Sequence, residues 1–167
     1  MANSSSTEAL LPLVYEELRA LASRYYLSAS GASVAPTSIV HEAFLKLAGK
    51  GHFTGEEHFA AVAATAMRQV LVDRVRREKA ARRGGGWERV SLSLALEGAA
   101  EQLDLEAVDA ALSKLQALDA RQARIVELRF FGGLTVLQVS KALEVSTSTV
   151  EKEWRSARAW LSAQLGA

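Results

Sequence analysis

The sequence predicts an all-α protein made of two small helical domains joined by a linker, the second of which contains a helix-turn-helix. Apolar residues recur at the spacing of amphipathic helices along most of the 167-residue chain, and no segment shows the alternation of a half-buried strand. The composition, 49% hydrophobic with two prolines, is typical of a folded protein rich in helix. A segment of glycine and acidic residues interrupts the helical patterns. We therefore expect domains at 8–83 and 105–165 and an acidic linker at 84–104.

Three helices are expected in the N-terminal half. The first covers 9–27, and a second begins where Thr37 or Ser38 can cap its free amides. The apolar face of this second helix is formed by Ile39, Val40, Ala43, Phe44 and Leu47. After a glycine-rich loop, a long third helix runs from about residue 58 to residue 81, and the glycine triplet at 84–86 ends it.

The C-terminal half is predicted to contain four helices. They cover 105–118, 120–131, 134–143 and 147–165. Asp119 is placed to cap the second of them, and Gly132 and Gly133 to stop it. The connector from residue 84 to about residue 103 gives weak signals and is expected to have little fixed structure.

Charge is segregated along the chain, although the net charge is only +1. The basic residues of one segment are Arg68, Arg74, Arg76, Arg77, Lys79, Arg82, Arg83 and Arg89. The acidic residues that follow, with no basic residue among them, are Glu97, Glu101, Asp104, Glu106 and Asp109. The basic segment is a candidate for binding nucleic acid, which the whole-chain average conceals.

Several classes of protein are disfavoured by the composition. Cysteine is absent, which excludes disulfides and thiolate metal sites. The N-terminus has no basic leader followed by an apolar core, and the most apolar stretch, 59–72, is shorter than the ~20 residues of a membrane span. We therefore expect a soluble, cytoplasmic protein that is not inserted in a membrane.

Residues 135–158 are predicted to form a helix-turn-helix, in which Ser146 caps the second helix. Its inward face is expected to hold Val136, Val139, Leu143, Val150, Trp154, Ala157 and Leu161. Lys152 and Arg155 can donate to guanine edges and Glu151 can accept from cytosine, while hydroxyls hold phosphates. The candidates for DNA contact are Thr147, Ser148, Thr149, Glu151, Lys152, Arg155, Ser156 and Arg158. The alternative is a surface helix of a bundle, whose mixed charges are simply solvated.

The segment LDARQARIVELRFFGGLTVLQVSKALEVSTSTVEKEWRSARAWL resembles the promoter-recognising C-terminal domain of bacterial sigma factors of the extracytoplasmic-function (ECF) group. TSIVHEAFLKL resembles that family's polymerase-docking helix, and AMRQVLVDRVRREKAARR its minus-ten helix. The matches span nearly the whole chain in the family's order. The resemblance implies that 105–165 reads the minus-thirty-five element, whereas 8–83 binds the polymerase clamp and melts and recognises the minus-ten element.

Site residues in the N-terminal half follow from this resemblance. The residues implied to hold the minus-ten strand are Phe53, His58, Phe59, Arg68, Gln69, Asp73, Arg76 and Arg77. Those implied to contact polymerase are Glu42, Leu45 and Lys46. Phe44 is expected in the core, and Phe53 and Phe59 have core packing as an equal alternative to base capture. The implied partners are core RNA polymerase and promoter DNA, and whether an anti-sigma factor or other regulator binds the chain stays open.

Three positions depart from the family pattern. Val62 stands where many relatives have tryptophan, Gln69 where they have asparagine, and Glu151 where they have a basic or small residue. The promoter sequence therefore cannot be copied from relatives. The acidic linker is implied to thread toward the basic RNA exit path of polymerase, with a solvated spacer as the alternative.

Catalysis finds no support in the sequence, and no cofactor is implied. His41 and Glu42 begin like a zinc-protease helix, but position 45 is leucine, so the second zinc-binding histidine is missing. The main alternative function is a dimeric helix-turn-helix regulator that acts without polymerase. A third is a protein-interaction module that keeps the motif without using it for DNA.

Overall fold

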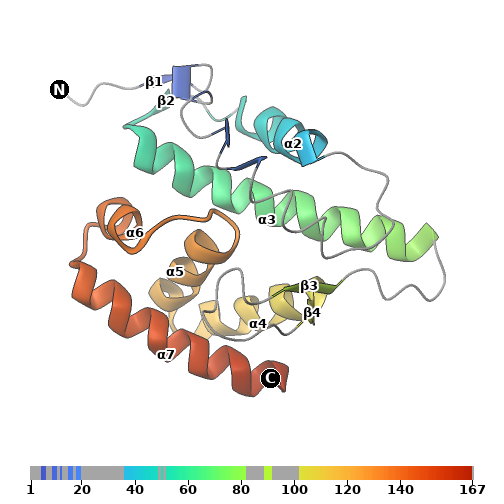
Figure 1. Ribbon diagram of the computed structural model, residues 1–167, viewed down its shortest axis with the longest axis vertical. Coiled ribbons are helices and arrows are strands. Elements are labelled where there is room, and N and C mark those ends of the chain that lie inside the picture. Colours follow the sequence, from blue (N-terminus) through green and yellow to red (C-terminus); the bar gives the residue numbers. More distant parts are fainter. Residues whose placement is uncertain are drawn as a thin grey trace.

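The computed structural model describes residues 5–6, 9–10, 12, 15–16, 18–19, 36–48, 50, 52–81, 89–91 and 102–166 (Figure 1). Its helices are α2 (Pro36–Ala48), α3 (Glu56–Ala81), α4 (Leu105–Leu118), α5 (Ala120–Phe130), α6 (Val136–Leu143) and α7 (Thr147–Leu165). These helices dominate the described residues, which confirms the all-α fold class. Within the expected first helix, 9–27, the structure describes only positions 9, 10, 12, 15, 16, 18 and 19, which are helical. Leu10 and Leu18 are buried, as the pattern predicts.

Two short antiparallel ladders accompany the helices. Strand β1 (Ser5–Ser6) pairs with β2 (His52–Phe53), and β3 (Arg89–Ser91) pairs with β4 (Gln102–Asp104). The sequence showed no strand pattern at these places. Strands of two or three residues are too short to show an alternating pattern, which needs about four residues to be recognised.

In the N-terminal half, α2 packs against α3, and its start differs from the prediction. Pro36 is the first helical residue, a position where its fixed φ suits the helix and its missing N–H costs nothing. Thr37 and Ser38 therefore lie inside the first turn, past the N-cap position. The buried residues of α2 are Ile39, Val40, Ala43 and Leu47, as predicted. Phe44 is only half-buried and lies outside the core, contrary to expectation.

In the C-terminal half, local signals fix the helix boundaries. Asp119 accepts a hydrogen bond from the Gln122 amide at 3.0 Å, so it caps α5 as predicted. Helix α6 starts later than expected because Thr135 caps it: its hydroxyl accepts from the Gln138 amide at 3.2 Å, and the Gln138 side chain accepts from the Thr135 amide at 2.8 Å. This reciprocal capping box satisfies amides that the helix leaves free. The bounds of α4 and α7 agree with the prediction.

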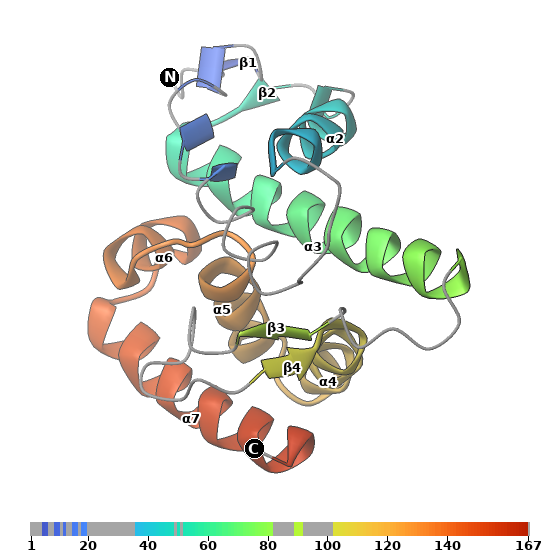
Figure 2. The same ribbon diagram turned by 45° about the vertical axis from the view of Figure 1, so that its right-hand side comes forward.

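The two halves share one hydrophobic core. Figures 1 and 2 show α3 between α2 on one side and the C-terminal helices on the other, and α3 contacts α4, α5 and α6. Buried side chains from both halves form a single cluster, which includes Met67 of α3 and Phe130 of α5. The sequence left the relative position of the two halves open, and the structure places them face to face.

Small residues allow this close approach. A β-carbon added at Gly132, in the turn after α5, would lie 2.7 Å from the Ala64 β-carbon of α3 and 2.7 Å from the Leu128 carbonyl oxygen. Because neither atom belongs to a flexible side-chain end, a larger residue at 132 would force the turn and α3 apart. Gly132 thus lets the halves meet, and Gly133, with φ of 65°, is the left-handed residue that follows α5.

Candidate nucleic-acid interface

Helix α7 begins at a well-formed cap. The Ser146 hydroxyl accepts a hydrogen bond from the Thr149 amide at 3.1 Å and donates to the Thr149 hydroxyl at 2.8 Å. Before it, Glu144 ends α6 in a left-handed conformation, with φ of 56°. These two features turn the chain sharply between α6 and α7. The predicted helix-turn-helix is therefore present, with Ser146 in the predicted role.

Helix α7 has one buried face and one exposed face, as the spacing of its apolar residues predicted. Its buried residues are Val150, Trp154, Ala157 and Leu161. Among the residues proposed for DNA contact, the exposed ones are Thr147, Ser148, Glu151, Lys152, Arg155 and Ser156. Thr149 and Arg158 are half-buried, and the Thr149 hydroxyl is already engaged with the cap. Two basic side chains thus project from the first turns of a capped helix, where positive charge and free amides favour phosphate.

Two arginines of α5, Arg121 in its first turn and Arg129 in its last turn, hold α7 in place. Arg121 donates from Nε to both carboxylate oxygens of Glu153, at 2.9 and 2.8 Å, and this hydrogen bonding raises the pKa of Arg121. The Arg129 guanidinium lies 5.0 Å from the centre of the Trp154 ring and donates to the Leu134 carbonyl oxygen at 3.0 Å. A guanidinium over a tryptophan face is a cation–π contact. The orientation of the exposed face of α7 is therefore fixed by side chains on its opposite side.

The predicted base-capturing loop contains two buried aromatic rings. Phe53 is 2% exposed and Phe59 is 0% exposed, and the rings pack edge to face with centroids 5.0 Å apart. This burial favours core packing, the alternative that the sequence left open for both residues. His58 is exposed, and its Nδ1 accepts a hydrogen bond from the Thr54 amide at 3.1 Å. Of the three, only His58 offers its ring to a ligand in this conformation.

The predicted polymerase-binding residues lie along one side of α2. Leu45 is 60% exposed and Lys46 is exposed. Glu42 is half-buried, and its carboxylate forms ion pairs with Arg74 and with Arg77, whose Nη2 is 3.7 Å from Glu42 Oε2. Two arginines of the basic segment that is a candidate for binding nucleic acid therefore neutralise a residue assigned to polymerase. Sequence reasoning missed this pairing because the two helices are separate in the chain.

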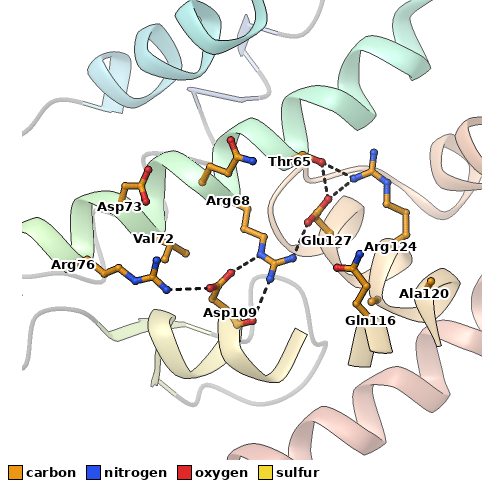
Figure 3. A pocket seen from close by; sticks show the side chains of 12 residues that line it. Thr65, Arg68, Val72, Asp73, Arg76, Asp109, Gln116, Ala120, Arg124 and Glu127 are labelled. Carbon is orange, nitrogen blue, oxygen red and sulfur yellow. Dashed lines mark hydrogen bonds and ion pairs between the residues drawn. The ribbon is translucent and has the colours of Figure 1, made fainter. Parts of the chain in front are cut away.

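Arg68 is the most thoroughly paired of the predicted minus-ten residues. Its Nε donates to Asp109 Oδ1 at 2.6 Å, its Nη1 to Glu127 Oε2 at 2.9 Å, and its Nη2 to the Asp109 carbonyl oxygen at 3.1 Å (Figure 3). Its side chain is 13% exposed. Both acidic partners belong to the C-terminal half, in α4 and α5. In this structure the guanidinium of Arg68 therefore contacts the C-terminal half of the chain, and its contact with nucleic acid stays a prediction.

Glu127 sits at the centre of this network. It accepts from the Thr65 hydroxyl at 2.7 Å and from Arg124, which also donates to the Thr65 hydroxyl at 2.7 Å and to the Ala61 carbonyl oxygen at 3.0 Å (Figure 3). Burial alone would raise the pKa of the Glu127 carboxyl, but the hydrogen bonds from Thr65 and Arg68 and the charge of Arg124 outweigh it. The pKa of Glu127 is therefore lowered, and the group is a carboxylate at neutral pH.

The same network keeps Arg68 charged. Burial alone would lower the pKa of its guanidinium, but the hydrogen bonds to Glu127 and Asp109 outweigh that effect and raise it. Arg76, about two turns further along α3, extends the contact: its guanidinium lies 3.6 Å from Glu106 Oε1 and 3.5 Å from Asp109 Oδ2. We call Thr65, Arg68, Arg76, Asp109, Arg124 and Glu127 the interdomain network. No local sequence signal reveals it, apart from Glu127 and Arg124 standing one helical turn apart in α5.

The interdomain network lines a cavity of about 480 Å³ between α3, α4 and α5. Gln69 and Asp73, which the sequence assigned to the minus-ten strand, line it from α3, and Gln116 faces them from α4. Both α3 residues are exposed. Arg82 and Arg83, two further residues of the basic segment, lie outside the described residues. The structure therefore brings Arg68, Gln69, Asp73 and Arg76 to one surface, and that surface faces the C-terminal half.

Comparison with known proteins identifies the family. Within the described residues, no helix is long and apolar enough to cross a membrane. The same residues contain no group of three or more histidine, aspartate or glutamate side chains arranged to hold a metal ion. Searches of curated proteins and of solved structures gave no match. A family model described as ECF sigma factor matches residues 2–167, nearly the whole chain, and the protein therefore belongs to the ECF sigma factor family.

Proposed function

We propose that this chain binds core RNA polymerase and directs it to start transcription at specific promoters. The observation that carries the proposal is the form of α7, which buries one face and exposes Lys152 and Arg155 above a capped N-terminus. Helices of this form place their first turns in the major groove, where such side chains reach base edges. Membership of a family of transcription initiation factors supports the same role. In that role the protein works in the cytoplasm, where polymerase and promoter are found.

The exposed face of α7 takes the minus-thirty-five element in this proposal. Lys152 and Arg155 read bases, Glu151 accepts from a cytosine amino group, and Thr147, Ser148 and Ser156 contact the phosphate backbone. Thr149 contributes through the cap it forms with Ser146. Arg158, half-buried further along α7, contacts backbone at most.

The minus-ten strand is assigned to α3 and the loop before it. Arg68, Arg76 and Arg77 bind backbone phosphates, while His58, Gln69 and Asp73 offer hydrogen-bonding groups to an extruded base. Their common location on α3 supports this assignment. Phe53 and Phe59 act mainly by holding the loop, since both rings are buried.

Polymerase binding is assigned to α2. Leu45 is an exposed apolar side chain next to the exposed Lys46, so both side chains are accessible to a protein partner. Glu42 contributes to that interface from its edge, where Arg74 and Arg77 neutralise it.

The test is reconstitution with bacterial core RNA polymerase. We expect the protein to co-elute with core enzyme and to direct transcription from promoters that start-site mapping identifies after its overproduction. The variants Lys152→Ala and Arg155→Ala keep polymerase binding but lose promoter selection, whereas Lys114→Ala, an exposed lysine of α4, serves as the matched control and changes neither.

Failure to join core polymerase at low salt would overturn the proposal. Binding of duplex DNA by the protein alone, as a dimer and without polymerase, would instead support the helix-turn-helix regulator. Unchanged transcription in the Lys152→Ala and Arg155→Ala variants would remove the role of α7 in promoter reading.

A further inference from the structure

Arg74 differs from the neighbouring arginines of the basic segment in where its side chain lies. It is 11% exposed, whereas the side chains of Arg76 and Arg77 on the same helix are 57% and 66% exposed. Its Nη2 donates to the Ser38 hydroxyl at 2.7 Å and also to the Glu42 carboxylate. Both of these partners belong to α2. The proposed function gives Arg74 no role, because its guanidinium is turned toward a neighbouring helix and away from any strand that binds the exposed arginines.

The bridge made by Arg74 spans the first turns of α2. Ser38 and Glu42 stand four residues apart, so they are neighbours on one side of the helix and one guanidinium nitrogen reaches both. The first amides of any helix lack partners within it, and the first turn of α2 contains no acidic side chain. Arg74 therefore ties down the end of α2 that its own sequence supports least.

This bridge is the directional part of the contact between α2 and α3, which lie side by side in Figures 1 and 2. The buried residues of α2 are all apolar, and apolar burial does not depend on direction. Hydrogen bonds weaken steeply when their geometry is disturbed. The bonds from Arg74 therefore restrict how α2 is rotated and shifted along α3.

We propose that Arg74 is a positioning residue for polymerase docking: its bridge to the first turns of α2 sets the direction in which Leu45 and Lys46 are presented. The inference rests on the polymerase-binding role proposed for α2. Leu45 and Lys46 follow Glu42 within about one helical turn, so a rotation of α2 would displace both side chains. Arg74 thus belongs to the polymerase side of the N-terminal half, although it stands within the basic segment.

The bridge itself is tested without polymerase. Arg74→Gln removes the guanidinium, and Ser38→Ala removes only one acceptor, which keeps the test available should Arg74→Gln fold poorly. We expect amide hydrogen exchange over residues 40–44 to be ~5-fold faster in Arg74→Gln and to rise less in Ser38→Ala, since local opening loses fewer bonds. Helical circular dichroism should stay unchanged. Unaltered exchange in both variants would overturn the bridge as a positioning contact.

The matched control is Arg77→Gln. It removes the same charge from α3, at a side chain that also pairs with Glu42, with Nη2 3.7 Å from Oε2. Because this pair is largely exposed, it contributes little to holding α2. Exchange over residues 40–44 should therefore stay at the wild-type rate. An equal acceleration in Arg77→Gln would show that loss of charge, and not loss of the bridge, is responsible.

The docking role is tested with core polymerase. Arg74→Gln should bind core enzyme about tenfold more weakly, because α2 then occupies its docking-competent position for only part of the time. Once core enzyme is saturated with this variant, the assembled complex should bind promoter DNA as the wild-type complex does. Arg77→Gln should give the reverse result, with wild-type affinity for core enzyme and weaker promoter binding, as a lost phosphate contact requires. A general loss of stability would not divide the two variants in this way.

A double-mutant cycle tests whether Arg74 acts through its two partners. In a chain that already carries Ser38→Ala and Glu42→Gln, Arg74→Gln should change the affinity for core enzyme by less than about twofold. The full loss in that background would mean that Arg74 contacts polymerase itself, which would overturn the positioning role.

The outcomes for Arg74 and for the proposed function are distinct. Equal binding of core enzyme by the wild type and by Arg74→Gln would overturn the inference and leave the proposed function intact. Failure of the wild type to join core enzyme would overturn the proposed function and the docking role together, whereas the exchange experiment would still decide whether Arg74 holds α2.

Discussion

The outward face of α7 and the cationic side of α3 carry the same kind of side chain in opposite situations. Lys152 and Arg155 are exposed, and within the described residues neither forms an ion pair. Arg68 and Arg76 of α3 are paired with carboxylates from the other half of the chain. One surface is ready for a partner, and the other already has one inside the molecule.

The difference follows from how each surface is supported. Helix α7 is held from behind, by its own core residues and by Arg121 and Arg129, so its polar face needs no further contact. Helix α3 is sandwiched between α2 and the C-terminal helices, and the polar residues between the halves must satisfy each other. Buried charges are tolerated only when they are paired, which explains why Arg68 and Glu127 are bonded so completely.

Removing the support of α7 is expected to have the largest effect. Trp154 is 6% exposed and packs under the Arg129 guanidinium. Trp154→Ala leaves a cavity and should lower the free energy of unfolding by ~3–5 kcal/mol. Urea unfolding followed by circular dichroism measures this loss. Trp160→Ala, at a half-buried position of the same helix, is the control, and an equal loss there would contradict the special role of Trp154.

Neutralising the centre of the interdomain network comes next. Glu127→Gln removes the charge that pairs with both Arg68 and Arg124 and should cost ~3 kcal/mol, because two guanidinium groups lose a buried partner. Glu153→Gln is the matched change in an ion pair whose arginine is 53% exposed, and it should cost ~1 kcal/mol or less. Similar losses in the two variants would show that the network is no stronger than a surface pair.

Lowering the pH should weaken the interdomain network progressively, as the Glu127 carboxylate becomes protonated. The pKa of Glu127 is lowered in the folded protein, so its carboxylate stabilises the fold fully above the ordinary value of 4.5. That contribution is lost as pH falls below 4.5 and through the lower folded-state pKa. Urea unfolding across this acidic range should show a steeper loss for the wild type than for Glu127→Gln. Parallel curves would mean that Glu127 is not the titrating group.

The sequence predicted α7 well because its signals are local. The cap at Ser146 and the spacing of Val150, Trp154 and Ala157 depend only on neighbours within a few residues. The same holds for Asp119 and the bounds of α4 and α5. The first turns of α2 and α6 were misplaced by one to three residues because several capping residues compete there.

The pairing on α3 was not predictable in the same way. Arg68 and Asp109 are 41 positions apart and Arg68 and Glu127 are 59 apart, so no pattern within one helix links them. A run of arginines gives the same signal whether its partner is a phosphate or a distant carboxylate. The short strands were missed, and the burial of Phe53 and Phe59 was left as one of two alternatives, for a related reason, since each depends on contacts made only after the chain folds.

The proposed role of the exposed face of α7 is tested by replacing one proposed base-reading residue. Arg155→Ala should weaken binding of promoter DNA by the polymerase complex by ~1–3 kcal/mol, the value of a bidentate contact to guanine. The loss should vary with the base at one position of the minus-thirty-five element, whereas a phosphate contact would lose affinity uniformly. Fluorescence anisotropy with single-base promoter variants separates the two, using Lys114→Ala as the control.

The smallest effect is expected at the N-terminal cap of α6, the first helix of the helix-turn-helix. Thr135→Ala removes the hydroxyl that accepts from the Gln138 amide, whereas the backbone amide of residue 135, which donates to the Gln138 side chain, remains. Loss of this capping box should lower the free energy of unfolding by ~1 kcal/mol. Thr135→Ser keeps the oxygen and should retain most of the stability. Since α6 supports α7 without presenting the proposed base-reading side chains, promoter affinity should change less than it does in Arg155→Ala, and a larger change would place α6 itself on the DNA.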